Sequence, residues 1–469
     1  MKLAILGGGG VRMPAFVRAV LTGGASFPGG ELFDEIALWE PDPTRRHTTG
    51  RLAVELAGAL GRPGVVTLSA DAEEAFTGAS FVFSAVRVGG DQGRVIDEQV
   101  ALKRGLVGQE TTGPGGAMMA LRTIPVVLEY SEMLRRCSPE AVLINFTNPA
   151  GAITQALSLH GRVPVVGVCD TPGGALERLA DFLDVLPGET SWLYSGLNHL
   201  GWVTSFKVAG EERIEDLLHR YEELQRFDHR FAAFDAEMVR KVGAIPTEYV
   251  FYFYDPRRYV DGVSRAGSSR GQDVLRLNEE LLAGISRAFD KGGVKEAWST
   301  YSTVLGVRRD TYMRTDTEGD NRQAQARAVR AERAPEQLEE AKIGGYEGVA
   351  LRVIAGLTSR QPARVIVNTR NAGSAVGFLD PDDVVEVPSY VYGGGIQPLA
   401  VGELPRPARG LVTQVKEYER ALVEAAVTGD AGLAEIALAL HPLVPGISSA
   451  KELLAEYREL HGPHLAYLK

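Results

Sequence analysis

The chain has 469 residues, of which 45% are hydrophobic and 23% are charged, and its formal net charge is −10. This length predicts two or three domains, and no apolar run approaches the ~20 residues that span a bilayer. The acidic balance disfavours nucleic acid as a partner, because neutralising phosphates requires a basic face, although a few converging arginines could still hold a small anion.

The N-terminal stretch MKLAILGGGG carries one lysine and a short apolar run that stops at glycines. This pattern is typical of a first β-strand and not of a cleaved secretory signal. The two cysteines of the chain provide no disulfide framework, in agreement with a reducing compartment. Together these features predict a cytoplasmic protein.

Five apolar runs recur through the first 170 residues, with helical patterns between them. Because the runs are apolar throughout, they indicate parallel strands that are buried on both faces and covered by crossover helices. The runs are residues 2–6, 35–40, 81–86, 141–146 and 164–169. We predict an α/β fold whose first domain, residues 1–190, is a Rossmann-like doubly wound parallel sheet.

Four consecutive glycines stand where the first strand passes to a helix, the place at which a dinucleotide pyrophosphate binds. They are Gly7, Gly8, Gly9 and Gly10. With Gly8 and Gly10 as the first two glycines of the dinucleotide fingerprint, Met13 takes the third place, so the strict G-x-G-x-x-G pattern is not met.

The second strand ends in Glu40, an acidic residue suited to the adenosine ribose hydroxyls, which favours NAD over NADP. The alternative for Glu40 is a plain surface carboxylate. Arg45 and Arg46 lie nearby, so NADP is not excluded as the cofactor.

Cys169 and His199 are candidate metal ligands. Cys169 lies at the carboxyl edge of the predicted sheet, and His199 follows thirty residues later, after Asn198. A thiolate and an imidazole can hold a divalent ion if substrate oxygens complete its shell. The alternatives are a buried, inert Cys169 and a capping or core His199.

Beyond residue 195 the pattern predicts a mixed α+β domain, residues 191–469, for catalysis and oligomerisation. Residues 212–241 and 272–290 have helical spacing, and residues 363–373 and 384–392 are typical of strands. Residues 308–338 are charged and poor in large apolar residues, which predicts a solvated helix-loop region. Two amphipathic helices, residues 412–427 and 450–460, are expected to pack on the core.

Segments along almost the whole chain resemble glycoside hydrolase family 4, the NAD- and divalent-metal-dependent glycosidases, and most of all its 6-phospho-β-glucosidases. After the glycine turn the matching segments are SAVRVGG, GLVGQETTGPGG, INFTNPAG, CDTP, GLNH, IPTEYVFYFY, GELPRPARGLVTQVKEYERALVEAAVTGD and HPLVP. The resemblance implies hydrolysis of 6-phospho-β-glucosides, NAD and a divalent metal as cofactors with Mn²⁺ as the expected ion, and a homodimer or homotetramer.

The resemblance also implies residue roles. Cys169 and His199 match the metal ligands, Tyr249 matches a tyrosine that acts as base, and Asp170 stands where enzymes acting on α-linked phosphosugars use an aspartate as proton donor. Arg87, Asn148 and Arg270 match substrate-binding positions. In the implied route the sugar is oxidised at C3 by NAD, Tyr249 removes the C2 proton, and the C1 substituent is eliminated before water adds.

Two of these residues have simpler interpretations. Asn148 precedes Pro149, and a role in a turn would be enough to explain it. Tyr249 belongs to an aromatic run that is typical of core packing. The usual pair of glycosidase carboxylates does not stand out, in keeping with the NAD-dependent family being an exception to that mechanism.

Three features depart from the phospho-β-glucosidase pattern. Arg12 follows the glycines where small hydroxyl residues are usual, Asp170 replaces the usual asparagine, and residues 308–338 lack a glycine-alanine-tyrosine-serine pattern. The alternatives are a 6-phospho-α-glucosidase or a non-phosphorylated glycosidase of the family, an NAD-dependent 2-hydroxyacid-type dehydrogenase, and an inactive NAD-sensing protein. The sequence has no histidine-arginine-aspartate set of the dehydrogenase kind.

Overall fold

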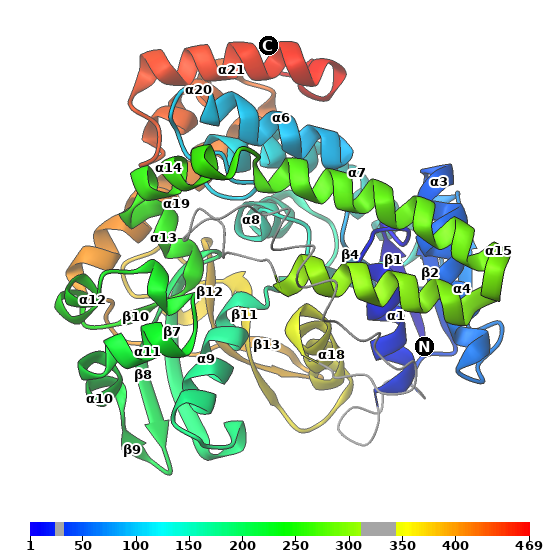
Figure 1. The fold of residues 1–469 in the computed structure, drawn as a ribbon, viewed down its shortest axis with the longest axis horizontal. Coiled ribbons are helices and arrows are strands. Elements are labelled where there is room, and N and C mark those ends of the chain that lie inside the picture. The colour runs from blue at the N-terminus through cyan, green and yellow to red at the C-terminus, as the bar shows by residue number, and fades with distance from the viewer. Residues whose placement is uncertain (24–31, 311–343) are drawn as a thin grey trace.

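The structure is a computed structural model that describes residues 1–23, 32–310 and 344–469. The described strands are β1 (Lys2–Leu6), β2 (Glu35–Trp39), β3 (Val66–Ser69), β4 (Phe81–Ser84), β5 (Val142–Asn145), β6 (Val165–Gly167), β7 (Thr190–Leu197), β8 (Leu200–Val208), β9 (Glu211–Glu212), β10 (Ile245–Pro246), β11 (Ala363–Arg370), β12 (Val384–Tyr392) and β13 (Gly395–Pro398). They join in one sheet, in the order β10-β8-β7-β12-β11-β6-β5-β4-β1-β2-β3, with β13 beside β12 and β9 beside β8 (Figure 1).

One half of this sheet is parallel and runs β3-β2-β1-β4-β5-β6, which is the strand order of a doubly wound dinucleotide-binding fold. The five strands predicted from apolar runs are all present, and the predicted α/β fold class is confirmed. The sequence does not predict β3, because only Val66 of its four residues is fully buried and no apolar run marks it.

The other half is antiparallel and continues the same sheet. β11 pairs with β6 through Asn368 and Gly167, and β12 pairs with both β11 and β7. The strands predicted at 363–373 and 384–392 are confirmed as β11 and β12, whereas the β7–β8 hairpin is not predicted. The domain boundary after residue 190 stays a prediction, since β7 begins at Thr190 and lies within the continuous sheet.

The described helices are α1 (Met13–Thr22), α3 (Pro43–Arg45), α4 (Arg51–Ala59), α5 (Ala72–Phe76), α6 (Gly90–Leu102), α7 (Pro114–Cys137), α8 (Ala150–His160), α9 (Thr171–Phe182), α10 (Ile214–His219), α11 (Tyr221–Phe227), α12 (Ala236–Val242), α13 (Phe251–Tyr254), α14 (Pro256–Ala266), α15 (Arg270–Asp310), α18 (Gly345–Thr358), α19 (Arg406–Thr428), α20 (Ala431–Leu440) and α21 (Ile447–His461). Short 3₁₀ or π segments are η1 (Arg46–Gly50), η2 (Pro187–Glu189), η3 (Phe231–Ala233), η4 (Glu248–Val250), η5 (Ala372–Ser374) and η6 (Gly462–Leu465).

The helical predictions are confirmed with changes in length. The stretch 212–241 forms three short helices, α10 to α12, and the last begins where the Asp235 carboxylate accepts from the Met238 amide at 2.7 Å. The stretch 272–290 lies in the longer α15, which is interrupted at Gly293 (φ 65°). The predicted helix-loop region lies outside the described residues from residue 311 to 338, and its first three residues belong to α15.

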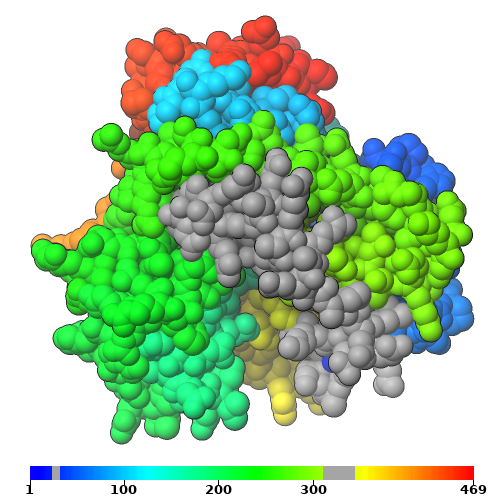
Figure 2. Space-filling view, in the orientation of Figure 1, coloured from blue at the N-terminus to red at the C-terminus, as the bar shows by residue number. Residues whose placement is uncertain are grey.

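Helices cover both faces of the sheet and bury two apolar clusters against it. One cluster packs α1 and α18 on the parallel strands, and the other joins α7, α8 and the C-terminal helices α19 to α21, as expected for α19 and α21. At the molecular surface α21 and α6 lie together at one end, and α15 crosses the face in front of the sheet (Figures 1 and 2). Within residues 1–23, 32–310 and 344–469, no helix is both long and apolar enough to cross a membrane.

A buried ion pair connects the C-terminal helix α21 to helices α6 and α7. Arg122 of α7 donates to both carboxylate oxygens of Asp97 on α6, at 2.6 and 2.7 Å, and His461 of α21 lies 2.8 Å from the same carboxylate. All three side chains are at most 1% exposed. The last helix therefore contributes to the support of the segment that follows β4, because Arg122 also contacts the carbonyl of Val88.

Candidate functional site

A cavity of about 980 Å³ opens at the carboxyl ends of the parallel strands. Its lining includes residues one or two positions past the ends of these strands, where doubly wound folds bind their ligands. They are Gly7 after β1, Glu40 after β2, Ala85 after β4, Phe146 after β5 and Cys169 after β6. Most of the residues singled out in the sequence also face this cavity.

The glycine turn packs tightly on the ends of its neighbouring strands. Gly7 has a φ of 80°, and a Cβ placed on it would lie 2.8 Å from the carbonyl oxygen of Ala85. The amides of Gly7 and Gly8 both donate to the carbonyl of Trp39, at 3.1 and 2.8 Å. Gly7 and Gly10 line the cavity, whereas Gly8 lies against Leu38 of β2 and Gly9 against the side chains of Glu40 and Arg45.

Glu40 lines the cavity, and two backbone amides hold its carboxylate in place. One carboxylate oxygen accepts from the Gly9 amide at 3.1 Å and the other from the Asp42 amide at 3.0 Å. Burial raises the pKa of this carboxyl above its usual value. The two nearby arginines have other partners, since Arg45 pairs with Asp91 at 3.0 Å and Arg46 donates to the carbonyl of Glu40 at 2.8 Å.

Cys169 and His199 line the same cavity, and each is 6% exposed. His199 occupies the two-residue turn between β7 and β8 with a φ of 62°, and its Nδ1 lies 2.8 Å from the hydroxyl of Thr111. This contact leaves Nε2 as the nitrogen that can ligate an ion. Burial lowers the pKa of His199 to about 3, which keeps the imidazole in its neutral, ligating form, and burial raises the pKa of the Cys169 thiol.

Among the described residues, no three His, Cys, Asp or Glu side chains gather around a point that could hold a metal ion. The chain offers a two-ligand set of soft thiol and imidazole at most. Such a set fits a divalent transition ion only if further ligands come from a bound molecule or from water.

Tyr249 lies in η4, and its ring stacks on the imidazole of His199. The ring centroids are 3.7 Å apart and the planes differ by 4°. Tyr249 is 7% exposed and lines the cavity, so its membership of an aromatic cluster with Tyr252 does not remove it from the site.

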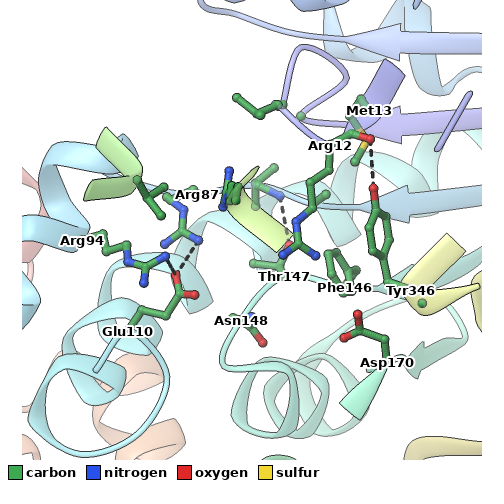
Figure 3. Close-up of a pocket in the computed structure, with 18 of the residues that line it drawn as sticks. Arg12, Met13, Arg87, Arg94, Glu110, Phe146, Thr147, Asn148, Asp170 and Tyr346 are labelled. Carbon is green, nitrogen blue, oxygen red and sulfur yellow. Dashed lines mark hydrogen bonds and ion pairs between the residues drawn. The ribbon is translucent and has the colours of Figure 1, made fainter. Parts of the chain in front are cut away.

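Arg12 and Asp170 occupy the other wall of the cavity. Arg12 lies over the ring of Tyr346, 5.0 Å from its centroid, and the Tyr346 hydroxyl donates to the Arg12 carbonyl at 2.9 Å. Asp170 stands just before α9 and directs its carboxylate toward the side of the cavity that holds Arg12 and Tyr346 (Figure 3).

Glu347 is a further carboxylate of this wall, and the sequence carries no signal for it. A Cβ placed on Gly345 would lie 3.4 Å from Glu347 Oε2 and 3.6 Å from Asp170 Oδ2, so the two acids flank the same glycine. Burial raises the pKa of Glu347 to about 7. The structure thus brings together a pair of acids that the sequence separates by more than 170 positions.

Arg87 and Asn148 line the middle of the cavity (Figure 3). Glu110 holds Arg87 at 2.7 Å and Arg94 at 2.9 Å. Burial opposes ionisation of Glu110, but Arg94 and Arg87 outweigh it and hold the pKa of this carboxyl below its usual range. Asn148 stands in the turn after β5, next to the cis peptide bond that it forms with Pro149, so it is both a turn residue and a cavity residue.

Arg270 begins α15 and donates to the carbonyl of Arg308 at 2.6 Å. Both arginines line the cavity. Burial, together with the charges of Arg12 and Arg270, lowers the pKa of Arg308 to about 9. Arginines that repel one another in this way are suited to an anionic ligand, and Arg308 is a member of the group that the sequence alone does not mark.

A doubly wound sheet with a glycine turn at its carboxyl edge, facing a thiol, an imidazole and a phenol, defines a Rossmann-type α/β enzyme. The model of family 4 glycosyl hydrolases matches residues 2–185, and the model of their C-terminal domain matches residues 194–444. The chain belongs to glycosyl hydrolase family 4 and is a glycosidase, as the sequence motifs predict. Membership of this family contradicts the dehydrogenase alternative.

Relatives with assigned activities cover the whole chain. A probable 6-phospho-beta-glucosidase of Bacillus subtilis (strain 168) is 30% identical, over 99% of the chain and 97% of the relative. The structure of the 6-phospho-beta glucosidase from Thermotoga maritima with manganese, NAD⁺ and glucose-6-phosphate is 27% identical, with a TM-score of 0.77 over 98% of both chains. A 6-phospho-alpha-glucosidase from gut microorganisms, solved with NAD and glucose-6-phosphate, is 26% identical, with a TM-score of 0.77 over 98% of this chain and 97% of its own.

Proposed function

We propose that this enzyme hydrolyses 6-phosphoglucosides, with a preference for the β-linked ones, and that it uses NAD and a divalent metal ion, Mn²⁺ being the expected one. The observation that carries the proposal is the convergence of Cys169, His199 and Tyr249 on the cavity that the glycine turn also borders. The relatives solved with NAD, manganese and glucose-6-phosphate support the choice of cofactors and of a phosphorylated sugar.

The residues of the cavity fit both cofactors. The turn at Gly7 and Gly10 admits close approach of a pyrophosphate to the backbone, and Glu40 lies at the end of β2, where ribose hydroxyls are bound. Cys169 and His199 would hold the metal ion. When bound, NAD would supply reversible oxidation of the sugar at C3, and the metal would supply Lewis-acid polarisation of the neighbouring oxygens.

The side chains of this protein then have defined tasks. Tyr249 removes the C2 proton, since its largely buried phenol stacks on the metal-ligand candidate His199 at the cavity wall. Arg87, Asn148 and Arg270 hold the phosphorylated sugar. Asp170 donates a proton to the oxygen that leaves C1, which is the assignment that keeps the α-linked alternative open.

Gly8→Ala is expected to weaken NAD binding about tenfold, because overpacking of this kind costs roughly 1–3 kcal/mol. A Cβ at this position would lie 2.6 Å from Leu38 Cβ and 2.9 Å from Leu38 Cα, so the turn must move away from β2. Quenching of tryptophan fluorescence during NAD titration measures the change. The control is Gly58→Ala in α4, where nothing lies within 4 Å; equal affinity of G8A and the unaltered enzyme would contradict the packing argument.

The substrate proposal is tested with four nitrophenyl glucosides, α- and β-linked, each with and without a 6-phosphate. With NAD, Mn²⁺ and a reductant, we expect nitrophenol release to be fastest from the β-linked phosphorylated compound and to stop when NAD is omitted. Faster release from the α-linked phosphorylated compound would show a preference for the α anomer. Release only from plain glucosides would show that the substrate is not phosphorylated.

We also propose a cytoplasmic homodimer or homotetramer with the division of the chain near residue 190. The family resemblance supports the assembly, and the two cysteines, which provide no disulfide framework, agree with a reducing compartment. Light scattering after size-exclusion chromatography distinguishes the oligomers, and a monomeric mass would contradict them.

A further inference from the structure

Glu386 is a buried carboxylate that the proposed chemistry does not use. It lies on β12, is 1% exposed, and accepts three hydrogen bonds from neutral donors. The Tyr194 hydroxyl donates at 2.7 Å, the Asn198 amide at 3.1 Å and the Asn368 amide at 2.9 Å. Burial raises the pKa of this carboxyl to about 7, and a positive charge nearby would favour its ionised form.

The three donors connect Glu386 to both segments that carry the candidate metal ligands. Asn198 is the first residue of the two-residue β7–β8 turn, and His199 is the second. In the β12–β7 ladder Glu386 stands opposite Gly196, directly beside that turn.

The link to the thiol runs through β11. Asn368 pairs with Gly167 at the end of β6, two residues before Cys169, and a Cβ on Gly167 would lie 2.8 Å from that of Asn368. Glu386 therefore lies between the end of β6 and the end of β7. The separation of these two ends determines the distance between the candidate metal ligands.

We propose that Glu386 is a positioning residue of the metal site, which holds the His199 turn against the Cys169 strand end and balances the charge of a bound divalent ion. The inference rests on the proposed function, in which Cys169 and His199 are the ligands. A divalent ion on one thiolate and one neutral imidazole retains a single positive charge, and a carboxylate behind both ligands neutralises it. Groups that orient metal ligands in this way typically change metal affinity by roughly 10- to 100-fold.

The test measures Mn²⁺ binding directly, by the loss of the electron paramagnetic resonance signal of free Mn²⁺ on titration with protein. Glu386→Gln keeps the shape of the side chain but removes its charge, and it presents an NH₂ group to at least one of the three donors. We expect Mn²⁺ affinity to fall roughly 10- to 100-fold, NAD affinity to stay within twofold, and excess Mn²⁺ to restore much of kcat.

The matched control is Asp383→Asn, another buried acid on the β11–β12 connection. Asp383 is 2% exposed and bonds to Arg420 at 2.9 Å, outside the cavity, so its Mn²⁺ affinity should match that of the unaltered enzyme. If E386Q does not fold, Asn198→Ala replaces it, and it should weaken Mn²⁺ binding about tenfold.

The outcomes separate this inference from the proposed function. Unchanged Mn²⁺ affinity in E386Q, or an equal loss in D383N, would overturn the role of Glu386. Failure of the unaltered protein to bind Mn²⁺ would overturn both proposals. Mn²⁺ binding that depends on Glu386 in a protein that cleaves no phosphoglucoside would leave the inference standing and overturn the substrate.

Discussion

Cys169→Ser is expected to abolish measurable Mn²⁺ binding and to lower kcat/KM by roughly 10³-fold, which corresponds to about 4 kcal/mol of transition-state stabilisation. The reason lies in the ligand count. In the described part of the chain Cys169 and His199 are the protein groups that face the cavity as candidate ligands, and no third acid, thiol or imidazole joins them in a metal-binding group. A neutral serine hydroxyl lacks the negative charge of a thiolate and is a weaker donor to a divalent ion.

The experiment combines steady-state kinetics on the phosphorylated nitrophenyl glucoside with Mn²⁺ titration. Cys137→Ser is the matched control, since Cys137 is the other cysteine and ends α7 outside the cavity lining. C137S should behave as the unaltered enzyme, and both variants should still bind NAD. Full activity in C169S would disprove the metal thiolate.

Tyr249→Phe is expected to lower kcat by roughly 10²- to 10⁴-fold, which is the usual contribution of a positioned general base to the rate. Phenylalanine keeps the ring that stacks on His199 at 3.7 Å, so Mn²⁺ and NAD affinities should change little. The loss is therefore expected in kcat and not in binding, because the phenol oxygen acts in the transition state.

Exchange of the sugar C2 proton with D₂O, followed by NMR, reports on this step alone. The unaltered enzyme should exchange the proton and Y249F should not. Tyr254→Phe serves as the control, because the Tyr254 hydroxyl makes no hydrogen bond within the described structure and does not line the cavity. Exchange in Y249F at the normal rate would assign the base to another group.

The parts of the fold that are local in the sequence are predictable from it. Runs such as residues 2–6 and 81–86 are apolar because both faces of those strands are buried, and that burial is visible in a short window. The β7–β8 hairpin is not visible in this way. The residues of its strands nearest the turn are buried, and most of those farther away are only partly buried. The pattern is therefore neither that of an interior strand nor a regular alternation.

The residues of the candidate site also differ in whether the local sequence predicts them. Cys169, His199 and Tyr249 lie within short distinctive segments and are found from them, although only the structure brings them to one cavity. Glu386 and Glu347 belong to no such segment. The bond from Asn198 to Glu386 spans 188 residues, and a single acidic residue in a strand carries no sign of a partner at that distance.

The order of strands in the sheet has a consequence for synthesis of the chain. β11 and β12 lie between β6 and β7, yet the ribosome produces them nearly 200 residues after β6. Until they emerge, the edge of β6 and the edge of the β7–β8 hairpin present unpaired amides and carbonyls, which are templates for wrong pairing. Nascent chains of this enzyme should therefore remain dependent on chaperones until translation has passed residue 392, and truncated products should aggregate instead of accumulating as folded halves.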